Sequence, residues 1–443
     1  MNSRRPNSGS GKFLLFGNHR GEGVDKGNVI ASFAPSRNFP KYHFFKARQR
    51  CRLTSFLFTV ILGRMTSSNR PISRRDFLKL AGLGLGAMAL RPLTSGLDIP
   101  QVSRAVLLPD FPKADLLGRN CTADTSMQWG GTIPIMPRPD VSGTKVRDAH
   151  RDEVFPWLKE VSAENIDFNL PNQRWVETPE GYIHSPSLQP CKNIPNVPLS
   201  ALPEGKVGFW AEVTVPYVDL MMDNPAPVSG WMRDHVAYGL QARLYYSQVM
   251  WMDQVRTTDA GTIQYHVNEL YGRTGDLFWA EGAAFRPLTE EDVAPINPNV
   301  DPATKKIVVN VSYQTLKCKE GDREVYFCRV STGMQDGSTP LGDFPIWRKL
   351  ISVRMAANTV GGSSYDLPGI SWTTLFVGDG VAIHGATSHN DFGTVRSHGC
   401  VNCKPEDAKW IFRWSQPTVP LEPGDITHQG MTGSTHVIVE DTL

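Results

Sequence analysis

In the last third of the chain, apolar and polar residues alternate in short runs, which is the pattern of half-buried β-strands. A run over residues 306–316 and another over 324–330 flank turn-forming residues at 320–322, and together they predict a β-hairpin. Further apolar runs predict strands at residues 344–347, 374–377 and 381–383. Residues 404–414 predict a helix, because a proline and two acidic residues occupy its first turn. The pattern indicates a mainly β domain with one or two helices.

Similar short runs occur upstream, where aromatic and β-branched residues are interrupted by turn signals. The segments 151–200 and 205–288 end in similar sequences, and each predicts a small SH3-like β-barrel module. Their Trp and Tyr side chains either form a sugar- or peptide-binding face or fill the barrel cores. A polar segment at 289–304 predicts a linker, and residues 90–150, which are rich in Pro, Gly, Asp and Ser, predict a tether.

Length and composition narrow the class of protein. The chain has 443 residues, 40% of them hydrophobic and 9% aromatic, so it can form several domains with cores and is not of disordered composition. No uninterrupted apolar run approaches the ~20 residues that a membrane-spanning helix needs. Seven cysteines are too few for a disulfide scaffold in a chain of this length.

Residues 65–89 have the organisation of an export signal. The paired arginines of Ser73-Arg74-Arg75-Asp76-Phe77-Leu78-Lys79 precede a Gly-rich apolar run that ends in Ala87-Met88-Ala89, a small-residue cleavage site. This order resembles a twin-arginine (Tat) signal and predicts export to the cell envelope. A cytosolic amphipathic helix is the alternative, but the Gly-rich run has no polar face. Because such signals lie near the start of a protein, we expect translation to begin at Met65 and residues 1–64 to be a wrongly assigned extension.

The net charge of +2 conceals an uneven distribution along the chain. Residues 1–89 carry 16 Lys and Arg against 3 acidic residues, whereas residues 90–443 carry 30 against 41. A basic arm of this kind can bind nucleic acid, but that role makes little sense on an exported protein. We therefore expect no nucleic acid partner and an acidic mature body.

One stretch near the C-terminus combines residue types that carry out nucleophilic catalysis. His384-Gly385 is followed, after an intervening loop, by Ser397-His398-Gly399-Cys400-Val401-Asn402. A cysteine attacks only as the thiolate, and with an ordinary pKa of ~8.5 it needs a base at neutral pH. His384 and His398 are both candidates. If residues 398–400 are extended, His398 and Cys400 project from one face, and the amides of Gly399 and Cys400 can point at a substrate carbonyl.

Three other interpretations of Cys400 stay open on residue types alone. It could be a buried core cysteine beside two loop histidines, since a free cysteine behaves as a small hydrophobe. Cys400 and Cys403 have the spacing of a zinc pair, but a second pair of ligands is missing. The same spacing occurs in thioredoxin-like redox sites, but the alternating strand and helix pattern of that fold is missing. We therefore expect no metal site.

The motif resembles the signature of the L,D-transpeptidases, the YkuD-type catalytic domain. Upstream, Val330-Ser331-Thr332-Gly333 and Thr339-Pro340-Leu341-Gly342-Asp343-Phe344 resemble that family's strand and Thr-Pro-x-Gly turn. The likeness covers residues 305–430. It implies a YkuD-type β-sandwich catalytic domain with one or two helices, preceded by the SH3-like modules.

The resemblance also implies roles for individual residues. Cys400 matches the acylated nucleophile and His384 its base, while His398 with Gly399 matches the segment that shapes the oxyanion hole. Ser397 and Asn402 match positions that line the site and hydrogen-bond its parts. The remaining pair lies where the family carries a lid over the substrate: Met355 and Tyr365.

Other cysteines leave alternatives open. Cys403 stands where the family is expected to have an apolar residue, and it either forms a disulfide with the nucleophile or packs in the core. Cys318 and Cys328 lie on opposite arms of the predicted hairpin, where they form either a cross-strand disulfide or two separate buried thiols.

The activity implied by the resemblance is the cross-linking of peptidoglycan stem peptides at the cell wall. In this family the cysteine attacks the carbonyl of the third stem residue, expels the terminal D-alanine, and passes the acyl group to an amine of another stem. No cofactor is implied, and carbapenems are the implied inhibitors. An L,D-carboxypeptidase or amidase with the same Cys and His, or a wall-binding protein without activity, are the alternative functions.

Overall fold

The computed structural model describes the part of the chain that follows the leader. The described residues are 108–122, 131–272, 275–357, 365–378, 380–428 and 433–442. The expected extension (1–64) and export signal (65–89) lie outside them. All described residues belong to one compact unit. Among the described residues, no helix has the length and apolar character required to cross a bilayer.

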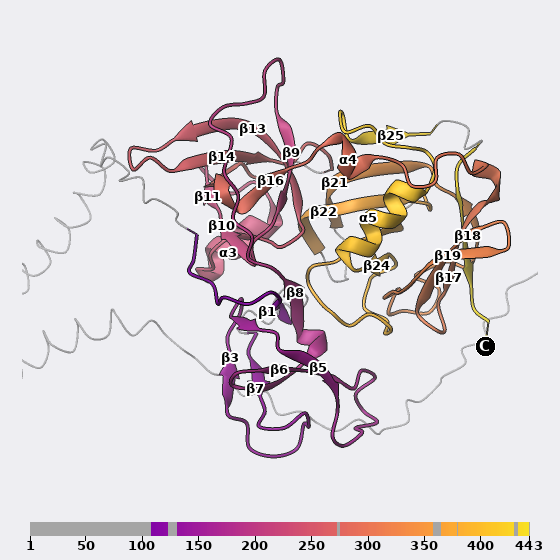
Figure 1. The fold of residues 1–443 in the computed structure, drawn as a ribbon, viewed down its shortest axis with the longest axis horizontal. Coiled ribbons are helices and arrows are strands. Elements are labelled where there is room, and N and C mark those ends of the chain that lie inside the picture. Colours follow the sequence, from indigo (N-terminus) through magenta and orange to yellow (C-terminus); the bar gives the residue numbers. More distant parts are fainter. Residues whose placement is uncertain are drawn as a thin grey trace, which may run out of the picture. The chain divides into compact units, whose positions relative to one another are not determined.

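A small β module comes first along the described chain (Figure 1). Its strands are β1 (Leu117–Asn120), β2 (Ile133–Ile135), β3 (Arg147–Ala149), β4 (Val154–Pro156), β5 (Lys159–Ser162), β6 (Arg174–Thr178), β7 (Gly181–His184) and β8 (Leu188–Cys191). They form the sheets β4-β1-β8, β2-β3 and β5-β6-β7, and a 3-10 turn at Ser185–Ser187 joins β7 to β8. We call the described residues between 108 and 191 the first module. Strands β1 to β3 lie in the stretch for which the sequence predicts a tether.

A second module is built on a six-stranded antiparallel sheet in the order β11-β15-β14-β13-β9-β16. Its elements are β9 (Phe209–Val213), β10 (Tyr217–Asp219), β11 (Met221–Met222), α3 (Gly230–Tyr238), β12 (Arg243–Tyr245), β13 (Val249–Thr257), β14 (Ile263–Asn268), β15 (Phe278–Glu281) and β16 (Phe285–Pro287). The aromatic side chains of Trp210, Trp251, Tyr265 and Trp279 are buried. These aromatic residues therefore fill cores and do not form an exposed binding face.

The C-terminal third follows a short helix α4 (Glu290–Val293) and forms two five-stranded sheets and one α-helix (Figure 1). The sheet orders are β19-β18-β17-β26-β20 and β24-β23-β22-β21-β25. The elements are β17 (Lys305–Asn310), β18 (Thr315–Glu320), β19 (Arg323–Arg329), β20 (Gly342–Pro345), β21 (Arg348–Ala357), β22 (Tyr365–Leu375), β23 (Ala382–Gly385), β24 (Val401–Cys403), α5 (Pro405–Trp414), β25 (Asp425–Thr427) and β26 (His436–Glu440). This confirms the mainly β class and the helix predicted over 404–414.

One strand prediction is wrong in detail. The run at 306–316 is not a single strand but two, β17 and β18, which pair antiparallel through a turn. Gln314 has a φ of 52° in that turn, so the chain reverses without a glycine. Because Gln314 is neither glycine nor proline, the sequence carries no turn signal at this point. The hydrophobic pattern alone therefore predicts one strand where the structure has two.

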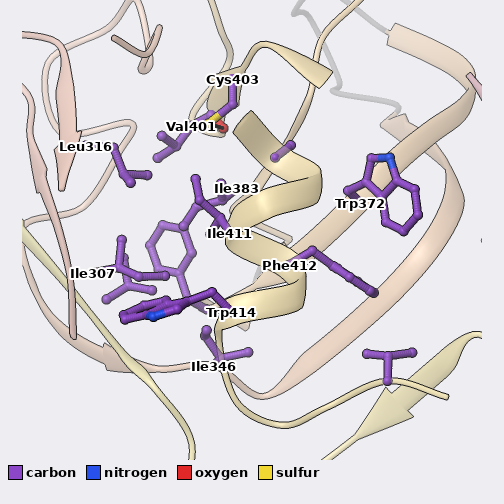
Figure 2. Packing of buried hydrophobic residues seen from close by; sticks show 14 of the residues in the cluster. Ile307, Leu316, Ile346, Trp372, Ile383, Val401, Cys403, Ile411, Phe412 and Trp414 are labelled. Atoms are coloured by element: carbon purple, nitrogen blue, oxygen red, sulfur yellow. Dashed lines mark hydrogen bonds between the residues drawn. The ribbon is translucent and has the colours of Figure 1, made fainter. Parts of the chain in front are cut away.

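The core of this domain lies between the two sheets and α5. Figure 2 shows how side chains from the three elements meet there. They include Ile307, Leu316, Ile346, Trp372, Ile383, Val401, Cys403, Ile411, Phe412 and Trp414. Cys318, Cys328 and Cys403 are buried free thiols in this cluster. Cys403 thus packs in the core and is not bonded to the nucleophile, and Cys318 and Cys328 are separate thiols.

Two buried lysines fix the C-terminal end of α5. Lys349 Nζ donates to the carbonyls of Phe412, Ser415 and Pro417 at 2.5, 2.8 and 2.8 Å. Lys305 Nζ donates to the carbonyl of Trp414 at 3.0 Å. The last carbonyls of a helix have no partner within the helix and carry partial negative charge, so cations stabilise this end. The helix is thereby held against both sheets, beside β23 and β24.

Candidate active site

Cys400 lies directly before β24, and β24 pairs in parallel with β23. The register places Val401 opposite Ile383 and Asn402 opposite His384. The half-buried Cys400 packs against a small cluster that contains Ala382, separate from the main core. Its Sγ lies 3.7 Å from the carbonyl oxygen of Gly380, to which the thiol donates. Cys400, the candidate nucleophile, therefore lies beside the N-terminal end of β23.

His384 lies on the same face of β23 as Ala382, because alternate residues of a strand share a face and the intervening Ile383 enters the core. The imidazole is buried, with 7% of the residue exposed. Its Nδ1 is 3.0 Å from the carbonyl oxygen of Gly385. A carbonyl can only accept, so Nδ1 carries the proton and Nε2 keeps its lone pair. This tautomer leaves Nε2 with a lone pair that can accept a proton.

A bend formed by residues 397–400 presents the thiol. Ser397 Oγ accepts from the Gly399 amide at 3.0 Å and donates to the Cys400 carbonyl at 2.6 Å. Thr339 Oγ1 donates to the Gly399 carbonyl at 2.8 Å and accepts from the Gly333 amide at 2.9 Å. The two upstream motifs of the sequence thus support this bend directly. The amide of Gly399 is engaged by Ser397, which leaves the Cys400 amide as the candidate oxyanion donor.

Residues 398–400 belong to this bend, so the condition that they are extended is not met. His398 consequently does not share a strand face with Cys400: its side chain is exposed and its ring lies 5.2 Å from the ring of Tyr365. Tyr365 begins β22, and Met355 near the end of β21 packs in the same small cluster as Cys400. A lid role for Met355 and Tyr365 stays a prediction; Tyr365 lies beside His398, and Met355 borders the same small cluster as Cys400.

Asn402 is buried beside His384 and contacts a histidine that the sequence pattern did not single out. Its side-chain amide lies 3.1 Å from Nε2 of His389, and Nδ1 of His389 accepts from the Asp391 amide at 3.2 Å. Burial lowers the pKa of His389 to about 3, so the ring is neutral. A neutral ring that accepts at Nδ1 carries its proton on Nε2, the atom that faces the Asn402 side-chain amide. His389 lies in an irregular loop, where no periodicity could reveal its position.

Electrostatics sets the resting state of the pair. Burial raises the pKa of the Cys400 thiol, although the Ala382 amide acts in the opposite direction. Burial also lowers the pKa of His384, although its contact with the Gly385 carbonyl acts in the opposite direction. Both groups are therefore neutral near pH 7, as a thiol and an imidazole. The arrangement fits general-base activation at the moment of attack and not a standing thiolate–imidazolium pair.

Comparison with known families decides the identity of this domain. Residues 304–439 match the YkuD family, described as the L,D-transpeptidase catalytic domain. The C-terminal third is an L,D-transpeptidase catalytic domain. Members of this enzyme family use a cysteine nucleophile, and the β-sheet modules lie upstream of the matched residues. Within the described residues, no cluster of three or more His, Cys, Asp or Glu is placed to hold a metal ion.

Solved structures of L,D-transpeptidases resemble parts of this chain. A Cys-to-Ser mutant from Enterococcus faecium is 21% identical, covers 31% of this chain and 50% of its own, and has a TM-score of 0.25. The enzyme from Mycobacterium smegmatis is 15% identical over 50% of this chain and 99% of its own, with a TM-score of 0.25. The E. faecium catalytic domain acylated by ertapenem is 20% identical over 31% and 97%, with a TM-score of 0.24. No curated protein matches the sequence.

The neutral resting pair of the L,D-transpeptidase domain predicts a broad pH profile. The active form needs His384 unprotonated and Cys400 protonated, so it exists between the two pKa values. Because the pKa of His384 is lowered and that of Cys400 is raised, the plateau of kcat/KM should extend beyond the ordinary pKa values of histidine and cysteine at both ends. The check is the pH dependence of D-alanine release. Fast alkylation of Cys400 by iodoacetamide at pH 5 would instead reveal a standing thiolate.

Gly399 cannot accept a side chain in the L,D-transpeptidase domain. Its φ is +153°, and a Cβ there would lie 2.6 Å from the backbone carbonyl oxygen of Ser338. To relieve this contact, the backbone at Ser338 or Gly399 must move. We therefore expect Gly399→Ala to displace the Cys400 thiol and lower kcat/KM by about 100-fold. Gly378→Ala is the matched control, since a Cβ there meets nothing within 4 Å. Equal activity of the two variants would show that the bend is not needed.

Proposed function

We propose that this protein is a peptidoglycan L,D-transpeptidase that links the third residues of two stem peptides and releases D-alanine. The placement of Cys400 and of the unprotonated Nε2 of His384 on one face of the sheet supports the proposal most directly. The family identity of residues 304–439 supplies the substrate class.

The first half-reaction forms a thioester. Nε2 of His384 takes the proton of the Cys400 thiol as Sγ attacks the carbonyl carbon of the third residue of a donor stem. The negative charge that develops on the carbonyl oxygen is stabilised by the Cys400 amide, held in place by the bend; such donors are worth about 3 kcal/mol each. The intermediate collapses with cleavage of the amide bond, and His384 returns its proton to the departing D-alanine amine.

The second half-reaction transfers the acyl group. A side-chain amine of the acceptor stem attacks the thioester carbonyl, and His384 takes the proton that this amine loses. The C–S bond then breaks, the new amide is the cross-link, and the Cys400 thiolate recovers a proton from His384. If water replaces the amine, the same residues release a tripeptide, which is the carboxypeptidase alternative.

Incubation with purified disaccharide-tetrapeptide, followed by mass spectrometry, tests the proposal. A dimer that has lost one D-alanine is the expected product. Tripeptide alone, even with excess acceptor, would assign the protein to the hydrolases. No product, together with no reaction of Cys400 with a cysteine probe, would point to a wall-binding protein without activity.

A covalent carbapenem adduct on Cys400 is a further expectation. The E. faecium catalytic domain described above has been captured acylated by ertapenem. In the present chain the thiol can open the strained β-lactam amide by the route it uses on the stem. Intact-mass analysis of the reduced protein should show one added carbapenem, and peptide mapping should place it on Cys400. An unmodified mass after long incubation would contradict the assignment.

Action on peptidoglycan requires the protein to be outside the cytoplasm. We propose export by the Tat route through residues 65–89, with translation from Met65. Sequencing of the N-terminus of the native protein tests this proposal. A peptide from residues 1–60 in the cellular protein would refute the start at Met65.

A further inference from the structure

The loop between His384 and Cys400, residues 386–399, is held by the first module; we call it the catalytic loop. Asn390 in this loop has only 2% of its surface exposed. Its amide donates to the Pro186 carbonyl at 3.0 Å, and its Nδ2 donates to Ser185 Oγ at 3.1 Å. Its own carbonyl accepts from the Arg174 guanidinium at 2.8 Å. Both backbone groups and the side chain of one loop residue are thus bound by one module.

Neighbouring positions of the catalytic loop are held by the same module. The Asp391 carboxylate accepts from Asn172 Nδ2 at 3.2 Å. The Thr387 carbonyl accepts from Arg119 at 3.0 Å, and this fully buried arginine pairs with Asp152 at 2.7 Å. Four side chains of the first module therefore reach the segment that joins the base to the nucleophile.

The groups that hold Asn390 are themselves fixed. Ser185 Oγ donates to Glu160 at 2.9 Å, and the Arg174 guanidinium lies 3.3 Å from the same carboxylate. Ser185 is fully buried. Side chains already restrained in this way lose little further entropy when they bind the loop, so their hydrogen bonds can define its position.

On its other side the same segment contacts the interior of the catalytic domain. His389 contacts the Asn402 amide, as described above, and the Asp391 carbonyl accepts from Ser331 Oγ at 3.0 Å. Ser331 pairs with Asn402 through backbone hydrogen bonds of 2.9 Å. Asn402 is the register partner of His384 and lies two residues after Cys400. Two sets of contacts therefore connect the residues on either side of Asn390 to Asn402, the strand neighbour of both reacting residues.

We propose that Asn390 is a positioning residue and that the first module forms a wall of the active site, aligning His384 with Cys400 through the catalytic loop. The inference rests on the proposed function only for the identity of the reaction. It assigns the first module a part in catalysis. Small misplacements of reacting groups can cost up to about 100-fold in rate, so loss of one anchor is expected to be measurable.

A mutant cycle between Asn390 and His384 tests the proposal in the full chain. The measurement is the rate of Cys400 alkylation by iodoacetamide at pH 7, with the modified peptide identified by mass spectrometry. Asn390→Ala should slow alkylation about tenfold with His384 present, and less than twofold in the His384→Gln background. Such non-additivity shows that Asn390 acts through the base. Equal factors in both backgrounds, or no effect in either, would overturn the proposal.

Ser185→Ala provides a second variant in case Asn390→Ala does not fold, and it should slow alkylation in the same direction by about threefold. Ser187→Ala is the matched control from the same 3-10 turn and should stay within twofold of the wild type. Thermal unfolding of each variant separates positioning from loss of fold. If the wild type releases no D-alanine while the cycle is non-additive, the proposed function fails and the positioning stands. D-alanine release with an additive cycle gives the opposite result.

Discussion

Cys400→Ala should abolish both D-alanine release and cross-linking while the domain stays folded. Loss of a catalytic nucleophile typically lowers kcat by about 10⁶-fold, so the residual rate should fall below detection. The fold should survive, because the half-buried thiol packs at the edge of a small cluster and not in the main core. The measurement is product analysis on disaccharide-tetrapeptide, with circular dichroism and thermal unfolding on the same sample.

Cys403→Ala is the matched control for the nucleophile. This thiol is fully buried in the core between the sheets, so its loss should cost stability and leave the chemistry intact. The two cysteines, three residues apart, should therefore show opposite phenotypes. Retained cross-linking by Cys400→Ala would end the assignment of Cys400 as nucleophile.

His384→Gln should lower kcat/KM by about 10²- to 10⁴-fold, the usual contribution of a general base. Glutamine keeps a polar side chain of similar size beside the Gly385 carbonyl but cannot accept a proton from the thiol. The rate of Cys400 acylation, followed by intact mass, reports this step without the transfer that follows. Alkaline pH should partly restore the variant, because the thiolate then forms without a base.

His398→Gln provides the contrast, since both histidines are candidates in the sequence. The exposed ring of His398 contacts Tyr365 and is not on a strand face with the thiol. We expect this variant to change KM more than kcat, because it alters the rim of the site. A larger loss of kcat in His398→Gln than in His384→Gln would exchange the two roles.

Much of the local structure could be predicted from the sequence. The helix predicted at 404–414 is confirmed. It could be predicted because a proline, two acidic residues and an apolar face all indicate the same element. Alternation predicts strands at β17, β19, β20 and β23 but not β21 or most of β22. It also misses the reversal between β17 and β18, because a left-handed Gln314 carries no turn signal. The residues at which a strand or helix begins and ends depend on tertiary pairing, so they are harder to predict from the sequence than the presence of the strand or helix.

The candidate site shows a similar division. The residue types of the motif identify a cysteine, its possible bases and a glycine that needs an unusual backbone. Residue types do not show that Thr339 holds the bend or that His389 contacts Asn402, because both contacts join segments far apart in the chain. Neither residue lies in a periodic element, so no pattern could reveal where its side chain would lie.

By itself the sequence determined the chemistry available to this protein, a Cys–His catalytic motif in a mainly β domain. It also determined that a basic N-terminal segment and further predicted β-strands precede this domain. Only the tertiary structure decided which histidine shares a sheet face with Cys400, through the parallel pairing of β23 with β24. It also decided that the first module binds the catalytic loop at Asn390. The reason is physical: nucleophilicity and turn preference belong to single residues, whereas strand register and module contacts follow from packing summed over the whole core.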